Sequence, residues 1–255
     1  MGTNRPNGSL YTNINDQVAT IEFGHPASNS FVSELLNRLT KEILALAVNE
    51  KVSVIILKSE GEKAFCAGAS FDELVAISNL DEGKSFFSGF ANVINAMRIC
   101  PKPIIGRVQG KAVGGGVGLA SACDYVFATV DAAIKLSEIS IGIAPLVIAP
   151  AVERKIGNSA LAELSFAPTE WKNAYWAKEK GLFSKVFDSI KEMDGELEHF
   201  SSQLASYNLE ALAAMKKVLW EGTEHWEKLL IERAQMSGKL ALSPATKEAL
   251  NKFKK

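Results

Sequence analysis

Three consecutive glycines, Gly114-Gly115-Gly116, constrain the fold of this chain more than any other feature. They follow an apolar, strand-like run at 103–108 and lead into a small-residue segment at 117–122 that is typical of a helix. Each glycine costs roughly 0.5–1 kcal/mol of helix or strand stability relative to alanine, so three together indicate that another group approaches the backbone closely. Free N–H groups and the dipole at a helix start favour negative charge. The segment is therefore a candidate oxyanion site, with a plain tight turn as the alternative.

Composition is that of an ordinary globular protein. The chain has 255 residues, of which 47% are hydrophobic and 22% charged, and its formal net charge is −1. This charge gives no broad attraction to nucleic acid or to an anionic membrane surface, so neither is expected as a partner. No apolar run approaches the about 18 residues of a membrane span, and no signal-peptide pattern is present.

Three cysteines, Cys66, Cys100 and Cys123, are widely spaced and include no C-x-x-C pair. This pattern is typical of reduced thiols in a cytosolic protein rather than of a disulfide framework or a zinc site. We therefore expect a soluble cytoplasmic protein without a metal centre.

Strand and helix patterns alternate through the first part of the chain. Two short strands at 10–14 and 18–23 are separated by Asn15-Asp16, and a helix is predicted over 31–48 with Ser30 as its N-cap. Further strands are predicted at 52–57, 103–108, 125–129 and 133–136, and another helix at 82–99. The alternation indicates an α/β core built from crossover units.

Ser70 and Glu73 have the spacing of a capping box, so a helix is predicted to begin at Phe71. From Val147 onward, helical patterns predominate with little strand between them. The predicted helical segments are 147–156, 159–166, 169–178, 190–206, 210–220, 226–240 and 244–253. We predict a flexible tail at 1–8, an α/β core at 9–190 and a helical region at 191–255.

Two backbone turns and one carboxylate form a candidate catalytic constellation. Ala69 and Gly115 each lie where a glycine-containing turn becomes a helix, so their N–H groups should be free to hold a carbonyl oxygen that gains negative charge. Glu138 stands between apolar neighbours at the end of a predicted strand, where burial would raise its pKa and suit it to proton transfer near neutrality. A salt-bridged surface or interface role is the alternative for Glu138.

Segments 63–70 (KAFCAGAS) and 110–124 (GKAVGGGVGLASACD) resemble the signature segments of the crotonase superfamily of enoyl-CoA hydratases and isomerases. The resemblance continues through 136–145 (LSEISIGIAP) and reaches 177–183 (AKEKGLF). It covers nearly the whole chain in the family's order and spacing, and the chain is identified as a member of this superfamily.

Membership implies an α/β fold, a crotonase spiral of ββα units, with C-terminal helices that build a homotrimer or a dimer of trimers. Ala69 and Gly115 match the family's oxyanion-hole positions, which bind the carbonyl of an acyl-CoA thioester. Coenzyme A is then part of the substrate, and no separate cofactor is expected. Ala27 and Ala67 match backbone positions that usually touch adenine or pantetheine. The other predicted substrate-binding residues are Ser70, Phe71, Gly118 and Ser137.

One position departs from the family's two-glutamate hydratases, because Gly118 stands where the first glutamate is expected and only the second, Glu138, is kept. Hydration needs water placed at Cβ and a proton delivered at Cα, so Glu138 would act alone on a single water. This Gly/Glu pattern looks most like that of methylglutaconyl-CoA and carboxygeranoyl-CoA hydratases, which implies a branched or carboxylated 2-enoyl-CoA. Arg98 and Arg107 are the cations to examine for a distal carboxylate, with structural or interface roles as the alternative.

Other functions share the same oxyanion chemistry. The alternatives are an acyl-CoA hydrolase, a decarboxylase, or a non-catalytic acyl-CoA-binding homologue. The β-hydroxyisobutyryl-CoA hydrolases of the superfamily share the Gly/Glu pattern, but they carry an aspartate where Leu146 stands in this chain. Release of free thiol, release of carbon dioxide, or binding without turnover would distinguish the three.

Overall fold

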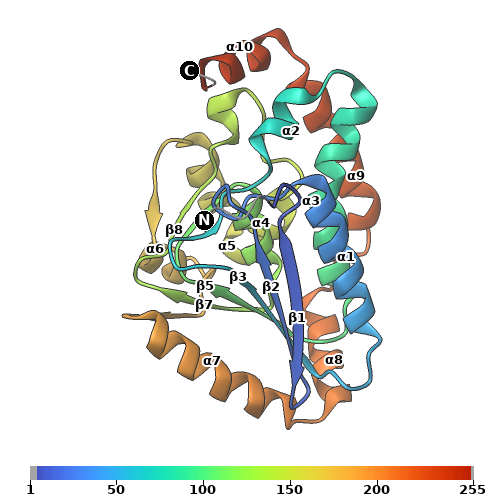
Figure 1. Ribbon diagram of the computed structural model, residues 1–255, viewed down its shortest axis with the longest axis vertical. Coiled ribbons are helices and arrows are strands. Elements are labelled where there is room, and N and C mark those ends of the chain that lie inside the picture. The colour runs from blue at the N-terminus through green and yellow to red at the C-terminus, as the bar shows by residue number, and fades with distance from the viewer. Residues whose placement is uncertain (1–4, 254–255) are drawn as a thin grey trace.

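The computed structural model describes residues 5–253, which form two sheets surrounded by helices (Figure 1). In the larger sheet, β1 and β2 form an antiparallel hairpin and the remaining neighbours are parallel. The order of its six strands is β1 (Ser9–Asn15), β2 (Val18–Gly24), β3 (Val54–Ser59), β5 (Ile104–Val108), β7 (Tyr125–Thr129) and β10 (Lys185–Phe187).

The smaller sheet supplies the second strand of each repeating unit. Its order is β4 (Ala64–Cys66), β6 (Lys111–Val113), β8 (Ala133–Lys135) and β9 (Lys172–Asn173). In the chain, β3, β5 and β7 are followed by β4, β6 and β8 respectively, and each pair is followed by helix. Parallel neighbours require such crossover connections. The expected spiral of ββα units is therefore confirmed.

Helices cover both faces of the larger sheet (Figure 1). Buried apolar residues of α7, including Met193 and Leu197, pack on one face, and α1, α3 and α4 contribute to the main core on the other. The helices are α1 (Ser33–Ala47), α2 (Phe71–Ala76), α3 (Leu80–Ile99), α4 (Gly115–Ala122), the 3₁₀ turn η1 (Glu138–Ile141), α5 (Ala149–Phe166), α6 (Ala174–Glu179), α7 (Ile190–Ala205), α8 (Leu209–Leu219), α9 (Trp226–Ala241) and α10 (Pro244–Phe253). No helix within residues 5–253 combines the length and apolar character needed to cross a membrane.

The start of α1 differs from the prediction. Its N-cap is Val32, which makes no side-chain capping bond, and not Ser30. Ser28 and Asn29 adopt left-handed backbone conformations with φ of 54° and 57°, so the chain is still turning there and cannot begin a helix. Phe31 then pairs with Ala69 in a parallel bridge, which delays the helix further.

Two other boundaries were also wrong. The first hairpin turns at Asp16-Gln17, since Asn15 still pairs with Val18. The helix predicted at 169–178 begins only at Ala174, because the two residues before it pair with β8 as strand β9. In contrast, the predicted gap near 157–158 corresponds to a real break in α5 at Gly157, where φ is 77°.

At the chain ends, Arg5 forms a bidentate ion pair with Glu60, with nitrogen–oxygen distances of 2.9 and 2.8 Å. Residues 1–4 of the predicted tail lie outside the described residues. Near the other end, α9 runs beside α3 and α10 lies against η1 (Figure 1). The C-terminal helices therefore reach the turn that begins with Glu138. The predicted boundary at 190–191 between the α/β core and the helical region stays a prediction.

Candidate active site

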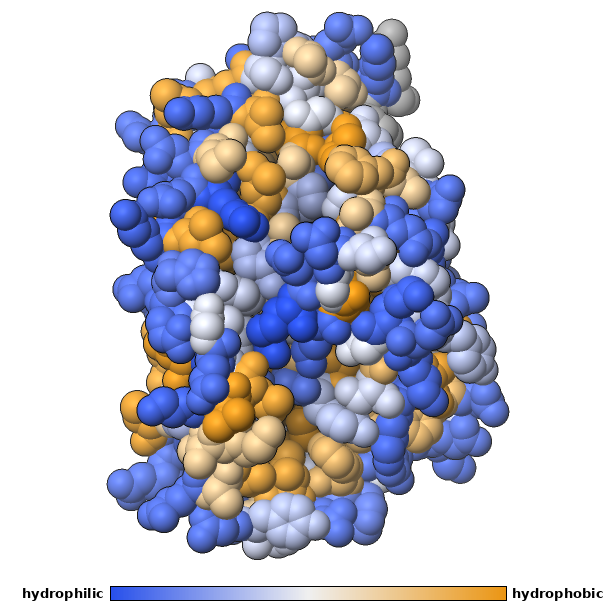
Figure 2. All heavy atoms as spheres, turned by 180° about the vertical axis from the view of Figure 1, so that it is seen from behind, coloured by the Kyte–Doolittle hydropathy of each residue, from blue (hydrophilic) through white to orange (hydrophobic). Residues whose placement is uncertain are grey.

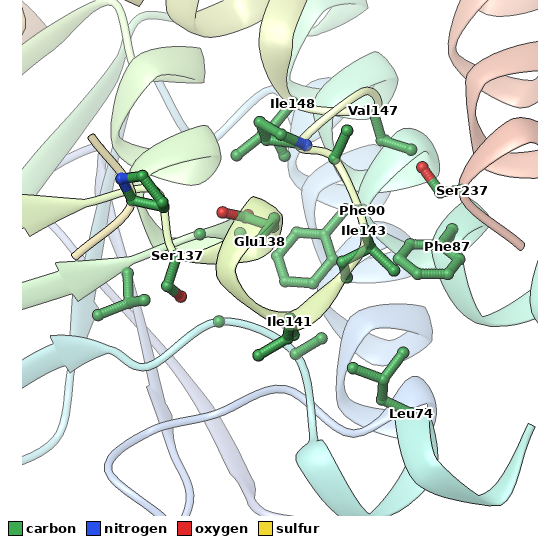
Figure 3. A pocket seen from close by; sticks show the side chains of 18 of the residues that line it. Leu74, Phe87, Phe90, Ser137, Glu138, Ile141, Ile143, Val147, Ile148 and Ser237 are labelled. Carbon is green, nitrogen blue, oxygen red and sulfur yellow. The ribbon is translucent and has the colours of Figure 1, made fainter. Parts of the chain in front are cut away.

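A cavity of about 470 Å³ lies between the two glycine-containing turns, α3, η1 and α9 (Figure 3). Aliphatic and aromatic side chains make up most of its wall, among them Leu74, Phe87, Ile143 and Val147. Among the described residues, the charged side chains of the wall are Glu138 and Lys135. The cavity is therefore suited to an apolar group that presents polar atoms at few points.

The Ala69 N–H group makes no hydrogen bond in the described structure, although the peptide groups on either side of Ala69 both bond to Phe31. The Phe31 nitrogen donates to the Gly68 oxygen at 2.8 Å, and the Ser70 nitrogen donates to the Phe31 oxygen at 2.7 Å. Both peptide groups beside Ala69 are thus held by Phe31, and the Ala69 nitrogen has no acceptor within residues 5–253. Ala69 lines the cavity, so its donor is available to a ligand.

The Gly115 N–H group is free for a different reason. Gly115 is the first residue of α4, and the first N–H groups of a helix have no intrahelical partner. The preceding nitrogen, on Gly114, donates to the Lys135 oxygen at 2.9 Å, which ties the turn to β8. The two turns are adjacent, since a Cβ placed on Gly68 would lie 3.6 Å from the Gly115 nitrogen.

Glu138 begins η1 and directs its carboxylate toward the glycine turn. A Cβ placed on Gly114 would lie 2.6 Å from Glu138 Oε1, so a side chain at 114 would displace this carboxylate from its position. Oε2 is buried and has no hydrogen-bond partner among the described residues. Burial raises the pKa of Glu138 from 4.5 to about 7, and a hydrogen bond from its own backbone N–H acts in the opposite direction.

Gly118 lies behind the cavity wall, where Ile148 fills the adjacent space. A Cβ on Gly118 would lie 2.7 Å from the Ile148 Cβ, which is far closer than two side chains can approach. Glu138 is consequently the one carboxylate on the described cavity wall. The apolar Ile148 thus occupies the space into which a side chain at 118 would project.

The remaining predicted site residues divide into two groups. Ala67, Phe71 and Ser137 line the cavity. Ser70 is buried beside it and accepts a hydrogen bond from the Glu73 nitrogen at 3.3 Å, which confirms its capping role. Ala27 is exposed on the adjoining turn and is not among the lining residues.

Neither arginine proposed for a distal carboxylate reaches the cavity wall. Arg107 pairs with Asp194 of α7 at 2.6 and 2.9 Å, on the opposite face of the larger sheet. Arg98 donates to the Asn95 side chain at 3.1 Å. The arginines therefore fit the structural alternative.

Sequence reasoning missed most of the apolar wall and, among the other residues, Lys135, Phe90 and Ser237. Lys135 precedes Glu138 by three positions, and its ammonium lies 4.5 Å from the Trp171 ring centre. Phe90 of α3 packs on the Gly115 backbone, with a ring atom 2.8 Å from where a Cβ would be. Ser237 comes from α9. Lys135 could have been found from its place at a strand end, but Phe90 and Ser237 carry no local signal.

This two-sheet spiral, with two free N–H groups beside a buried carboxylate, defines a protein of the crotonase class. The chain belongs to the enoyl-CoA hydratase/isomerase family, whose model matches residues 13–254.

Individual comparisons agree with that assignment. The chain is 36% identical over 167 residues to human mitochondrial methylglutaconyl-CoA hydratase, a match that spans 65% of this chain and 49% of the human protein. It is 29% identical over 208 residues to the peroxisomal Delta(3,5)-Delta(2,4)-dienoyl-CoA isomerase of Arabidopsis thaliana, with 77% and 74% covered. The crystal structure of enoyl-CoA hydratase from Bacillus halodurans shares the fold, with a TM-score of 0.88 at 21% identity over 95% of this chain and 99% of that one.

Proposed function

We propose that this protein catalyses the reversible hydration of a 2-enoyl-CoA thioester, with Ala69, Gly115 and Glu138 as its catalytic groups. Family membership supports acyl-CoA chemistry, and the likeness to a methylglutaconyl-CoA hydratase supports hydration. One observation carries the proposal. A single buried carboxylate with an unpaired oxygen shares an apolar cavity with two unpaired backbone N–H groups.

In this reaction the ionised Glu138 takes a proton from water while the water oxygen bonds to Cβ. The electron pair of the Cα=Cβ bond shifts onto the thioester oxygen, and the Ala69 and Gly115 N–H groups stabilise the resulting enolate. Glu138 then returns the proton to Cα. One carboxylate and one water therefore suffice, and all added atoms come from that water.

Replacement of Glu138 by glutamine tests this assignment. Glutamine keeps the size and hydrogen-bonding shape of the side chain but cannot carry the proton, so we expect kcat to fall at least 10²–10⁴-fold. Crotonyl-CoA and 3-methylglutaconyl-CoA are suitable substrates, with products detected by mass spectrometry and affinity for a saturated acyl-CoA measured separately. That affinity should change little.

The matched control is Glu153→Gln, an exposed glutamate of α5, which should retain full activity. If Glu138→Gln keeps more than a few per cent of the rate, Glu138 is not the proton-transfer group. Release of free thiol or of carbon dioxide would instead identify a hydrolase or a decarboxylase. Binding without turnover would identify a non-catalytic homologue.

The same substrate pair addresses a carboxylated acyl group. Lys135 is the cation on the described cavity wall, and no acidic side chain within residues 5–253 pairs with it. We propose that it would meet a carboxylate of the acyl group. A higher kcat/KM for 3-methylglutaconyl-CoA than for crotonyl-CoA supports this pairing, and a lower value contradicts it.

We further propose a homotrimer or a dimer of trimers. Figure 2 shows apolar residues gathered at the lower end of the molecule, where α8 lies in Figure 1. Exposed apolar side chains of α8 are Leu209, Met215, Val218 and Leu219. Light scattering should give three or six times the 27.5 kDa chain mass. A mass of one chain would contradict the proposal.

A further inference from the structure

Ser237 of α9 is a buried hydroxyl with nothing in the described structure to bond. Its exposed fraction is 1%, its Oγ has no hydrogen-bond partner, and it lines the cavity that also holds Glu138. Figure 3 shows its Oγ directed from α9 toward Val147, on the opposite side of the cavity from Glu138 and Ser137. The Ser237 end of the cavity is therefore remote from the proposed reaction centre.

The hydroxyl of a serine or threonine within a helix can donate to the carbonyl one turn back. This chain does so elsewhere, since Ser88 Oγ donates to the Lys84 oxygen at 2.7 Å and Thr40 Oγ1 donates to the Leu36 oxygen at 2.9 Å. Ser237 does not make this bond, although the Arg233 carbonyl lies one turn before it. Its hydroxyl is thus left for a group inside the cavity.

The packing of α9 on α3 brings Ser237 to the wall. The adjacent residue, Gly238, crosses α3 at Gly83, where a Cβ on either glycine would lie 2.8 Å from the other glycine's backbone. A side chain at this crossing would push α9 outward and withdraw Ser237 from the cavity. The position of the hydroxyl is therefore set by two glycines.

The surroundings of Ser237 indicate what it binds. Figure 3 shows it beside Phe87, Val147 and Ile143, all of them apolar. The charged side chains of the described wall, Lys135 and Glu138, belong to the segment at the opposite side. The Arg233 guanidinium, one turn before Ser237 on α9, donates to the Leu146 oxygen at 3.3 Å and is not part of the described wall. A buried polar group without a partner is costly, and an anion at an end whose described wall carries no cation would be more costly still. The ligand group that fits is an uncharged oxygen.

We propose that Ser237 is a specificity-determining residue that hydrogen-bonds a hydroxyl or carbonyl oxygen on the acyl chain, remote from the thioester. The inference rests on the proposed function, because it takes an acyl-CoA as the occupant of the cavity. It adds that the preferred acyl group is an oxygenated chain and not a plain alkyl chain of the same length.

Equilibrium binding tests this without requiring turnover. Hexanoyl-CoA is compared with its 4-, 5- and 6-hydroxy derivatives by titration calorimetry, since a saturated chain cannot be hydrated. We expect one hydroxy isomer to bind about ten- to a hundredfold more tightly than hexanoyl-CoA to the unmodified protein, as is typical where a site hydrogen bond depends on one ligand group. In Ser237→Ala this preference should disappear while affinity for hexanoyl-CoA stays equal or improves.

Two further variants control for the loss of a helical hydroxyl as such and for the change in side-chain volume. Ser88→Ala removes a helical serine that already bonds its own helix and does not line the cavity, so the preference should survive. Ser237→Cys keeps the volume with a weaker donor and should give an intermediate preference; thermal melts verify that each variant is folded.

Equal binding of all four ligands to the unmodified protein would overturn the inference and would mean that water satisfies Ser237. A hydroxyl preference that persists in Ser237→Ala would overturn it as well. If no acyl-CoA binds at all, the proposed function itself fails, and this inference fails with it.

Discussion

At the scale of single residues, the chemistry of Glu138 depends on a glycine that is distant in sequence. Gly114 has φ of 52°, a left-handed conformation that side chains disfavour, and its missing side chain leaves space for Glu138 Oε1. The same residue ends the turn that exposes the Gly115 N–H group. One glycine therefore serves both the carboxylate and the oxyanion donor beside it.

The raised pKa of Glu138 predicts a dependence of stability on pH. The folded carboxyl ionises near pH 7 and the unfolded one near 4.5, so the folded state binds more protons between these values. Stability of the native sequence should therefore fall as pH rises from about 4.5 to about 7. Glu138→Gln has no carboxyl group at this position, so its stability should not fall for this reason.

Urea unfolding at several pH values checks this. The advantage of Glu138→Gln over the native sequence should be near zero at pH 4 and grow to at most about 3 kcal/mol above pH 7. A constant difference across this range would show that the carboxylate is not buried in the folded protein.

The contact between Gly118 and Ile148 gives a second residue-scale prediction. Gly118→Ala should destabilise the protein by about 1–3 kcal/mol because the new methyl group overlaps Ile148. Added to Ile148→Ala, which alone leaves a cavity, it should cost much less than it does alone. The control is Gly195→Ala in α7, where a Cβ meets nothing within 4 Å and a small gain in stability is expected. Strictly additive effects would contradict the overlap.

At the scale of elements, α10 holds the turn that presents Glu138. The buried Thr246 donates its hydroxyl to the Gly142 oxygen at 2.7 Å and accepts from the Ser243 hydroxyl at 2.9 Å. Gly142 directly follows η1, whose first residue is Glu138. A helix close to the end of the chain thus positions a group more than a hundred residues before it.

Thr246→Val should loosen this attachment, because it removes both bonds while keeping the shape of the side chain. We expect a local loss of about 1–3 kcal/mol, faster amide exchange in α10 and residues 138–143, and a lower kcat. Thr40→Val in α1 removes a hydroxyl that bonds only its own helix and should leave exchange in those segments unchanged. Unaltered exchange in Thr246→Val would mean that other contacts hold the turn.

At the scale of the whole molecule, a buried polar network joins the C-terminal helices to the sheet. The Lys216 ammonium of α8 lies 2.9 Å from Asp124 Oδ2, and its side chain is 4% exposed. It also donates to the Lys102 oxygen at 2.8 Å, while the Trp220 indole donates to Asp124 Oδ1 at 2.8 Å. Asp124 immediately precedes β7 and accepts from the Ile104 nitrogen at the start of β5, so α8 is anchored where these two neighbouring strands of the larger sheet begin.

Lys216→Met should destabilise the protein by about 3–5 kcal/mol, because it leaves the Asp124 carboxylate buried without its cation. The adjacent Lys217→Met changes an exposed residue of the same helix and should stay within about 0.5 kcal/mol of the native sequence. Denaturant midpoints measure both. Similar midpoints for the two variants would show that the buried pair contributes little.

Local patterns in the sequence were sufficient for the alternation of strands and helices, the cap at Ser70 and the two glycine turns. They failed at Ser30 and at 169–173, where backbone pairing with a distant strand or bridge overrode local helix preference. Pairing partners of this kind have no signature within a short window, because the bonds join segments many residues apart.

By itself, the sequence determined the fold family, the two turns with free N–H groups and the isolation of Glu138, since each depends on residue type and short-range spacing. Only the tertiary structure decided that Ile148 fills the space beside Gly118, that Arg107 faces away from the cavity and that Ser237 reaches into it. These facts depend on how helices and sheets pack, and packing brings together side chains that are separated by tens of residues or more.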